Sequence, residues 1–185
     1  AAGAREDVAR IAVQPADLFQ LETARDPRIA PDGSAVVYAR HTASDKDDRW
    51  HDELWVVDVA SGEQRPRTSG TRNDGRARWS PDGNMIAVSA EEYDAATNTL
   101  VHSGVYVADV VYTGNRPTGV SNLRQIIETG GSAGLDWSPD SGKIVYTDAA
   151  GDLAVYTLAT GTSVRITSTS GRSEQAPTRS SRGRI

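Results

Sequence analysis

A short phrase rich in turn-forming residues occurs three times along this chain of 185 residues. It reads Ile-Ala-Pro-Asp-Gly at 29–33, Trp-Ser-Pro-Asp-Gly at 79–83 and Trp-Ser-Pro-Asp-Ser-Gly at 137–142. Each copy is followed by a run in which apolar and polar residues alternate, which indicates a β-strand. The prolines of successive copies are 50 and 58 residues apart, close to the roughly 40–50 residues of a four-stranded propeller blade. This spacing predicts an all-β repeat protein and excludes a helical solenoid.

The residues of the phrase are those that a tight turn between two strands requires. Proline fixes φ at the second position, Asp accepts a hydrogen bond from the backbone just ahead, and Gly closes the turn into the next strand. In two copies the residue before the turn is a tryptophan, Trp79 or Trp137. Because a wide indole covers much apolar area, we expect both rings to be largely buried between neighbouring sheets.

Each repeat contains four strand candidates, bounded by turns that are rich in Gly and Asp. They span 26–29, 35–40, 54–59 and 64–68, then 76–79, 85–90, 105–110 and 123–128, then 135–137, 143–147, 153–158 and 163–167. The predicted fold class is all-β, a β-propeller fragment of about three four-stranded antiparallel blades plus the start of a fourth. A lead-in with a short helical turn spans 1–24, and the partial propeller spans 25–185, with blades at 25–74, 75–132 and 133–172 and the next starting at 173–185.

A closed ring needs more blades than this chain contains. Propellers typically have four to eight blades, and an open arc leaves an uncovered apolar face at each end. We therefore expect the chain to be part of a longer polypeptide, with its ends covered by further blades or by another copy. Residues 174–185 align with the start of a fourth blade, although Arg179, Ser181 and Arg182 stand where Trp, Pro and Asp are expected. The alternative for this stretch is a disordered basic tail.

Three segments and the lead-in carry a resemblance to a known family. They are residues 26–33, the run Leu-Trp-Val-Val-Asp-Val-Ala-Ser-Gly-Glu at 54–63, the segment 78–83, and Pro-Ala-Asp-Leu-Phe-Gln-Leu at 15–21. Together they resemble the N-terminal β-propeller of the prolyl oligopeptidase family of serine peptidases, particularly its dipeptidyl-peptidase and acylaminoacyl-peptidase-like members. Residues 15–21 are similar to the helical turn before the first blade of that family. Periplasmic Tol-type propellers use the same Ser-Pro-Asp-Gly phrase and are the alternative.

The resemblance implies a propeller that gates entry and selects peptide substrates for a catalytic α/β-hydrolase domain outside these residues. The parent protein would then be a hydrolase that takes part in proteolysis. The parent protein would bind the peptide substrate through its catalytic domain. This chain would contact the remaining blades and the hydrolase domain, or another copy of the chain. The alternative is a non-enzymatic periplasmic Tol-type β-propeller that mediates protein–protein interaction.

Composition argues against several functional classes of protein. The net charge of −5 argues against a nucleic-acid surface, and no apolar run approaches the roughly 20 residues of a transmembrane helix. The chain has no cysteine, which removes disulfides, metal–thiolate sites and thiol catalysis, and we expect no cofactor. The small residues at 1–4 are not a signal peptide but are compatible with a signal removed upstream. We therefore expect a periplasmic or secreted protein, with a cytoplasmic one as the alternative.

One segment matches the pattern of a hydrolase nucleophile. Residues 130–134 read Gly-Gly-Ser-Ala-Gly and fit Gly-x-Ser-x-Gly, which works only where a strand turns sharply into a helix, with the acid and the His following. Here a blade strand follows, and the histidines His41, His51 and His102 all precede Ser132. We therefore interpret the match as accidental and expect no catalytic residue in this chain.

Two acidic segments are candidates for binding. In dipeptidyl-peptidase members of the resembled family a Glu pair on the propeller binds the substrate's amino terminus, which places Glu91 and Glu92 as candidate substrate-binding residues. Two fixed carboxylates can hydrogen-bond an ammonium group. In this sequence, however, Ser89 and Ala90 stand where those members carry aromatic residues before the pair, so a solvated loop is the alternative.

The acidic run at 45–53 offers oxygen ligands for a cation, but it lacks the turn glycine of a calcium loop. We expect a hydrated loop there, and no metal site.

Overall fold

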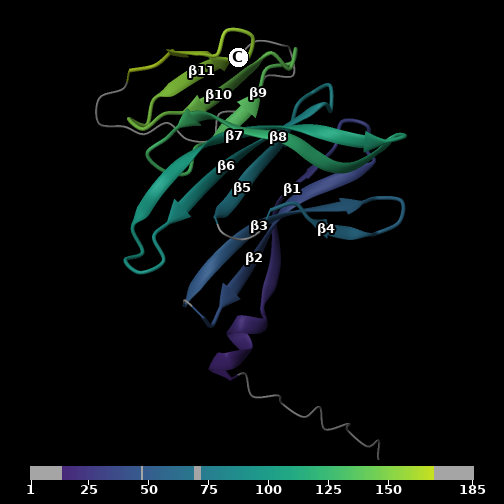
Figure 1. The fold of residues 1–185 in the computed structure, drawn as a ribbon, viewed down its shortest axis with the longest axis vertical. Helices are drawn as coiled ribbons and strands as arrows, with labels where there is room; N and C mark the ends of the chain where they lie inside the picture. Colours follow the sequence, from purple (N-terminus) through teal and green to yellow (C-terminus); the bar gives the residue numbers. More distant parts are fainter. Residues whose placement is uncertain (1–13, 47, 69–71, 169–185) are drawn as a thin grey trace, which may run out of the picture.

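Three antiparallel four-stranded sheets make up the chain, and they are stacked one on another in sequence order (Figure 1). The structure is a computed structural model and describes residues 14–46, 48–68 and 72–168. A 3₁₀ helix, η1 (Pro15–Gln20), precedes the first sheet. The all-β class and the three four-stranded blades are confirmed, whereas the expected start of a fourth blade at 173–185 lies outside the described residues.

The sheets use consecutive strands, each hydrogen-bonded to the next. The first contains β1 (Glu22–Ile29), β2 (Ala35–Ser44), β3 (Arg49–Asp58) and β4 (Gln64–Pro66); the second contains β5 (Asn73–Trp79), β6 (Met85–Tyr93), β7 (Leu100–Thr113) and β8 (Arg116–Glu128); the third contains β9 (Leu135–Trp137), β10 (Lys143–Thr147), β11 (Leu153–Thr157) and β12 (Thr162–Arg165). In the third sheet the observed bounds lie within two residues of the predicted ones. In the second, β7 and β8 run far beyond the predicted 105–110 and 123–128 and form a long hairpin.

The repeated phrase forms the turn that its chemistry predicts. In the second copy Gly83 N donates to Ser80 O at 2.9 Å, and Ser80 Oγ donates to Asp82 Oδ1 at 2.6 Å. Gly83 has φ +77°, a left-handed conformation that Gly adopts without steric cost. In the third copy Ser141 takes this position with φ 59°. Each turn therefore closes its own hairpin locally, without help from the rest of the fold.

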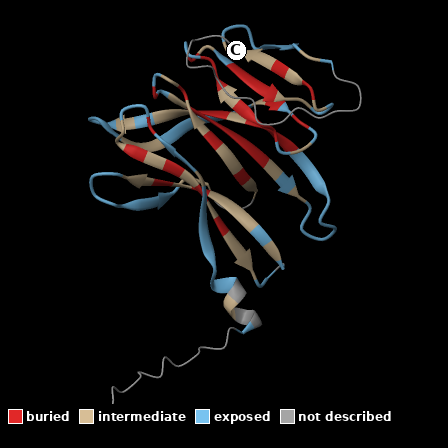
Figure 2. Cartoon of the chain, turned by 180° about the vertical axis from the view of Figure 1, so that it is seen from behind, coloured by how far each residue is buried: buried red, intermediate tan, exposed pale blue. Residues whose placement is uncertain are grey.

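Two apolar cores hold the stack together, one in each seam between neighbouring sheets. The first core joins Val37, Leu54 and Val56 of the first sheet to Ile86 and Val88 of the second. The second core joins the second sheet to the third, and its buried residues include Val105, Val107, Leu135, Trp137 and Ile144. The middle sheet is covered on both faces, so its strand β6 is buried continuously from Ile86 to Ala90, whereas buried residues alternate with half-buried ones along β2 (Figure 2).

The two turn tryptophans make equivalent contacts with the preceding sheet. Trp137 Nε1 donates to Arg78 O at 2.9 Å, and Trp79 Nε1 donates to Arg28 O at 3.2 Å. Trp137 is fully buried, as expected, with 0% of its surface exposed. Trp79 packs against the first core but is less enclosed than Trp137: it is half-buried, because its ring lies beside an apolar hollow at the margin of the first seam.

A charged contact reinforces the first seam. Asp26 has φ 47° at a bulge in β1, and its carboxylate accepts from Arg28 of its own strand at 2.6 Å. The same carboxylate accepts from Arg78 of β5 at 2.6 Å. The ion pair therefore spans the two sheets beside the indole–carbonyl contact, and both act to fix the relative position of β1 and β5.

We expect Trp137→Ala to lower the free energy of unfolding by about 3–5 kcal/mol, the range for deleting a large aromatic from a packed interior. Trp79→Ala should cost less, because its ring is already partly in contact with water. Trp137→Phe is the matched variant that keeps most of the packing and loses the hydrogen bond. Denaturant unfolding measures all three, and an equal loss in the two alanine variants would contradict this picture of the seams.

Candidate functional site

The Gly-x-Ser-x-Gly segment does not form a nucleophile elbow. Ser132 is exposed in the connection between β8 and β9, and the chain continues directly into the strand that begins at Leu135. The next residue, Ala133, is buried, and its amide donates to Ser89 Oγ of β6 at 3.0 Å. The segment thus connects two blades and anchors the connection to the second one, which agrees with the interpretation of the motif as accidental.

The two carboxylates of the Glu pair lie on opposite faces of β6. Glu91 follows Ser89 on the face toward the third sheet, and its carboxylate accepts from Tyr93 OH at 3.1 Å. Glu92 lies on the other face, opposite its cross-strand partner His102. Because neighbouring residues of a strand point to opposite faces, this geometry does not bring the two carboxylates together around one ammonium group.

The acidic segment 45–53 is mostly strand, which corrects the expectation of a hydrated loop. The β2–β3 ladder continues to the pair of Ser44 with Arg49, so residues 49–53 of this segment belong to β3. Along this hairpin the buried His41 contacts Asp52 through Nδ1 at 2.6 Å and stacks on Trp50 with ring centroids 4.4 Å apart. Trp50 therefore packs within its own blade. Across residues 14–46, 48–68 and 72–168 no cluster of His, Asp and Glu could hold a metal ion.

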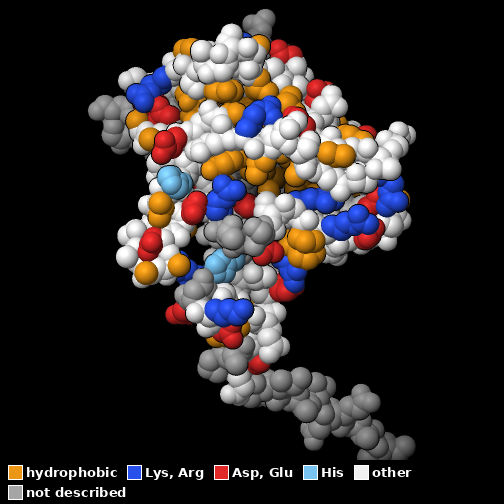
Figure 3. All heavy atoms as spheres, viewed as in Figure 1, with side chains coloured by type: hydrophobic (Ala, Val, Ile, Leu, Met, Phe, Trp, Pro, Cys, Tyr) orange, Lys and Arg blue, Asp and Glu red, His pale blue; other side chains and the backbone are white. Residues whose placement is uncertain are grey.

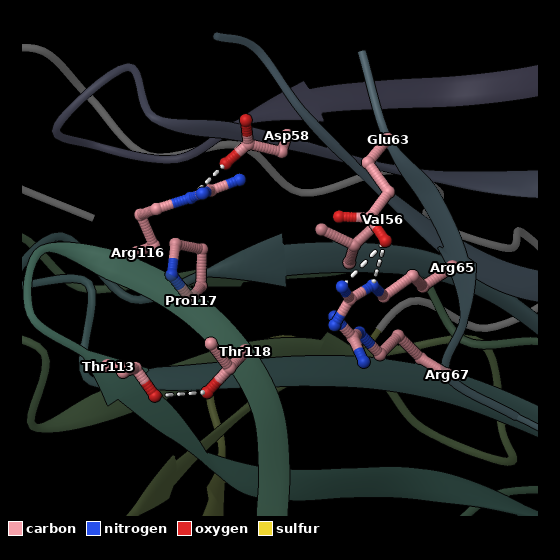
Figure 4. A pocket seen from close by; sticks show the side chains of 9 residues that line it. All are labelled: Val56, Asp58, Glu63, Arg65, Arg67, Thr113, Arg116, Pro117 and Thr118. Atoms are coloured by element: carbon pink, nitrogen blue, oxygen red, sulfur yellow. Dashed lines mark hydrogen bonds and ion pairs between the residues drawn. The ribbon is translucent and has the colours of Figure 1, made fainter. Parts of the chain in front are cut away.

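The structure reveals a different candidate site, a cleft lined by arginines at the margin of the first seam (Figure 4). Its volume is about 170 Å³. Arg65 and Arg67, in and just after β4, form one wall, and their guanidinium groups lie next to each other. Arg116 and Pro117, at the tip of the β7–β8 hairpin, form the other. We call this hollow the arginine cleft.

The charges of the arginine cleft do not balance. Glu63 accepts from Arg65 Nη2 at 2.6 Å, and Asp58 accepts from Arg116 Nε at 2.9 Å. Arg67 has no acidic partner among the described residues. Burial, together with the neighbouring charge of Arg65, lowers the pKa of Arg67. Among the residues that the structure describes, the cleft therefore keeps one cation without a counter-charge, and burial and Arg65 disfavour the charge of this cation.

The long hairpin is tied to the first sheet at the same place. Besides its bond to Asp58, Arg116 donates through Nη2 to Ser61 Oγ at 3.3 Å. The side chain and backbone of Ser61 both donate to Asp58, and together with Arg116 they lower the pKa of Asp58 to about 2. Asp58 is therefore a fixed anion that closes one end of the cleft and joins the β3–β4 turn to the tip of the hairpin.

Sequence reasoning missed this site. Its two walls are about fifty residues apart in the chain, and neither carries a recognised motif. The available signals were the alternation Arg-Pro-Arg at 65–67, which places two cations on one face of a strand, and the longer spacing between the second and third turn phrases. That extra length forms part of the hairpin that brings Arg116 to the cleft.

Asp58→Asn should change how stability depends on pH. The folded pKa of about 2 is below the ordinary value of 3.8, so ionised Asp58 stabilises the fold above that value, and this contribution is lost as the pH falls toward 2. We expect the melting temperatures of wild type and D58N to differ most near neutral pH and to converge at the acid end. Asp45→Asn, in the exposed β2–β3 turn, is the matched control, and a difference independent of pH would contradict the assignment.

Comparison of the sequence with known proteins identifies a peptidase relative. No family model matches the chain. It is 28% identical over 137 residues to the uncharacterized peptidase YuxL of Bacillus subtilis, a match that covers 74% of this chain and 19% of that protein.

Comparison of the structure identifies propellers. TolB from Acinetobacter baumannii matches with a TM-score of 0.61 and 19% identity, over 88% of this chain and 36% of that one. Puromycin hydrolase matches with a TM-score of 0.57 and 18% identity, over 78% and 23%. Pyrococcus horikoshii acylaminoacyl peptidase matches with a TM-score of 0.55 and 13% identity, over 80% and 26%. The chain thus has the fold of a β-propeller segment, and its resemblance to the propellers of prolyl oligopeptidase-family peptidases is confirmed.

Proposed function

We propose that this chain is the gating and substrate-selecting propeller part of a serine peptidase that acts on peptides, with the catalytic α/β-hydrolase domain outside residues 1–185. The similarity to a peptidase over 74% of the chain carries this proposal. The propeller fold of an acylaminoacyl peptidase supports it. The chain spans 19% of the length of the curated relative, which leaves room in such a protein for a separate catalytic domain.

In this proposal the propeller contributes shape rather than reacting groups. Its blades are rigid because two apolar seams and the inter-sheet contacts of Trp79, Trp137 and Arg78 fix them face to face. A ring of such blades encloses a central channel. Access to a catalytic domain through a channel of fixed width would admit an extended peptide and exclude a folded protein.

The first test of the proposal is covalent labelling of the full-length protein with a fluorophosphonate, which reacts with activated serines. We expect the adduct on a serine outside residues 1–185, and Ser132→Ala should leave labelling and peptide hydrolysis unchanged within a few-fold. Loss of activity by several orders of magnitude in that variant, as removal of a triad member gives, would show that Ser132 is the nucleophile after all. Absence of any adduct and of any peptidase activity would reject the peptidase proposal.

A non-enzymatic Tol-type propeller that binds protein partners is the second candidate. The structural match to TolB, which covers 88% of this chain with a TM-score of 0.61, favours it. If the chain is a Tol-type propeller, we expect the protein in the periplasm, and cell fractionation tests this location. In the described part of the chain no helix is long and apolar enough to cross a membrane.

The open face of the first sheet supports the proposal that further blades, the hydrolase domain or another copy cover this chain. Val36 and Tyr38 of β2 and Val57 of β3 lie on the face that points away from the second sheet. They line a hollow of about 500 Å³ together with Pro27. Because a blade normally packs an apolar face of this kind against its neighbour, we propose that a further blade occupies it.

Residues 1–185 expressed alone should therefore aggregate or form oligomers, because exposed apolar faces associate in water. Light scattering measures the mass of the species. Val36→Lys, which places a charge on the open face, should reduce the association, and Val101→Lys, at the exposed start of β7 in the middle sheet, is the matched substitution away from the end sheets. A cooperatively unfolding monomer at high concentration would contradict the proposal that other blades cover this face.

A further inference from the structure

The arginine cleft has the charge and the hydrogen-bond donors of an anion site. Its three guanidinium groups face two carboxylates, and Arg67 is the cation left over within the described part of the chain. Thr113 and Thr118 add two hydroxyl groups on the opposite wall, with their oxygens 3.3 Å apart. The cationic side chains gather at the right-hand margin of Figure 3, between β4 and the tip of the β7–β8 hairpin.

The cleft adjoins an apolar hollow between the same two sheets. Val56, Arg67 and Pro117 line both spaces, so the two are immediate neighbours. Beyond them the hollow is lined by apolar side chains that include Val120 and Leu123, and its volume is about 50 Å³. Leu123 is 52% exposed. A ligand whose anionic group lies among the arginines would therefore place its next few carbon atoms against apolar walls.

We propose that the arginine cleft binds a carboxylate that carries a short apolar group, the chemistry of a peptide C-terminus that ends in Leu or Val. The carboxylate would bind Arg67, whose planar guanidinium presents two parallel donors to a carboxylate. It would also supply the counter-charge that Arg67 lacks. The apolar side chain of the same residue would enter the hollow beside Pro117 and Leu123.

The geometry favours a carboxylate over a phosphate. The cleft offers one unbalanced positive charge, which a single carboxylate neutralises, whereas a phosphate dianion would leave a negative charge beside Asp58 and Glu63. The apolar side chains of the adjoining hollow also offer no favourable contact to the oxygens of a phosphate. Because the site lies at the outer margin of the first seam, this proposal does not depend on whether the chain serves a peptidase or a Tol-type propeller.

The test titrates the full-length protein with N-acetyl-leucine and with N-acetyl-leucinamide by saturation-transfer NMR, and measures inorganic phosphate by its competition with bound N-acetyl-leucine. We expect N-acetyl-leucine to bind with a dissociation constant in the millimolar range, roughly the affinity of one charge-assisted contact plus a small apolar group. The amide keeps the apolar group but lacks the negative charge, so we expect it to bind at least about tenfold more weakly. Inorganic phosphate should bind more weakly than N-acetyl-leucine.

Arg67→Ala should weaken N-acetyl-leucine binding about tenfold or more, and Arg67→Lys, which keeps the charge but loses the planar fork, should recover part of it. Arg124→Ala is the matched control, because Arg124 lies on β8, the strand of Arg116, but pairs with Asp109 outside the cleft. Leu123→Ala should reduce the preference for N-acetyl-leucine over acetate and leave acetate binding unchanged. The melting temperature of each variant verifies that it is folded.

Four results would overturn the proposal. Equal binding of N-acetyl-leucine and its amide would show that the carboxylate is not recognised. Tighter binding of phosphate would assign the cleft to a different anion. Binding of N-acetyl-leucine that survives Arg67→Ala in a folded protein, or no binding at all in the wild type, would show that the cleft is not the site.

Discussion

The face-to-face contact between neighbouring sheets is the interaction on which the rest of this structure depends. A four-stranded sheet of this length has apolar faces rich in Val, Ile and Ala, and in this chain each covered face is buried against a neighbouring sheet. The middle sheet does so on both sides, and therefore β6 is buried continuously from Ile86 to Ala90. The indole of each turn tryptophan donates to a carbonyl of the preceding sheet, which adds a directional contact to an apolar seam that would otherwise permit sliding.

Charged and polar side chains lie at the margins of a seam, where the apolar contact between two sheets ends. In the first seam the β7–β8 hairpin extends past the second blade and places Arg116 against Asp58 of the first. The hairpin thereby encloses a space between itself and β4 that is basic at its mouth and apolar at its floor. A shorter hairpin, of the length predicted from the sequence, would leave Arg65 and Arg67 on an open surface rather than in a cleft.

The fold keeps the candidate side chains that the sequence offered apart from one another. Ser132 leads into a strand, and the buried His41 is already engaged by Asp52 and Trp50 within its own hairpin. Glu91 and Glu92 point to opposite faces of β6 because strand geometry separates neighbouring side chains. This arrangement suits a scaffold whose contribution is the placement of blades, as the proposed gating function requires.

The sequence by itself determined the blade: the turn chemistry, the four strands per repeat and their order are local, because each hairpin closes through contacts a few residues apart. The alternation along β6 would also have separated Glu91 from Glu92. Only the tertiary structure decided that Trp137 is enclosed while Trp79 remains half-buried, since this depends on which sheet covers each ring. It also decided the arginine cleft, because Arg67 and Arg116 lie 49 residues apart in the chain and meet only when two blades stack. Local sequence determines backbone dihedral preferences and hydrogen-bonded turns. The charge balance of a cleft depends on side chains from distant parts of the chain, and no local sequence pattern shows which of them will meet.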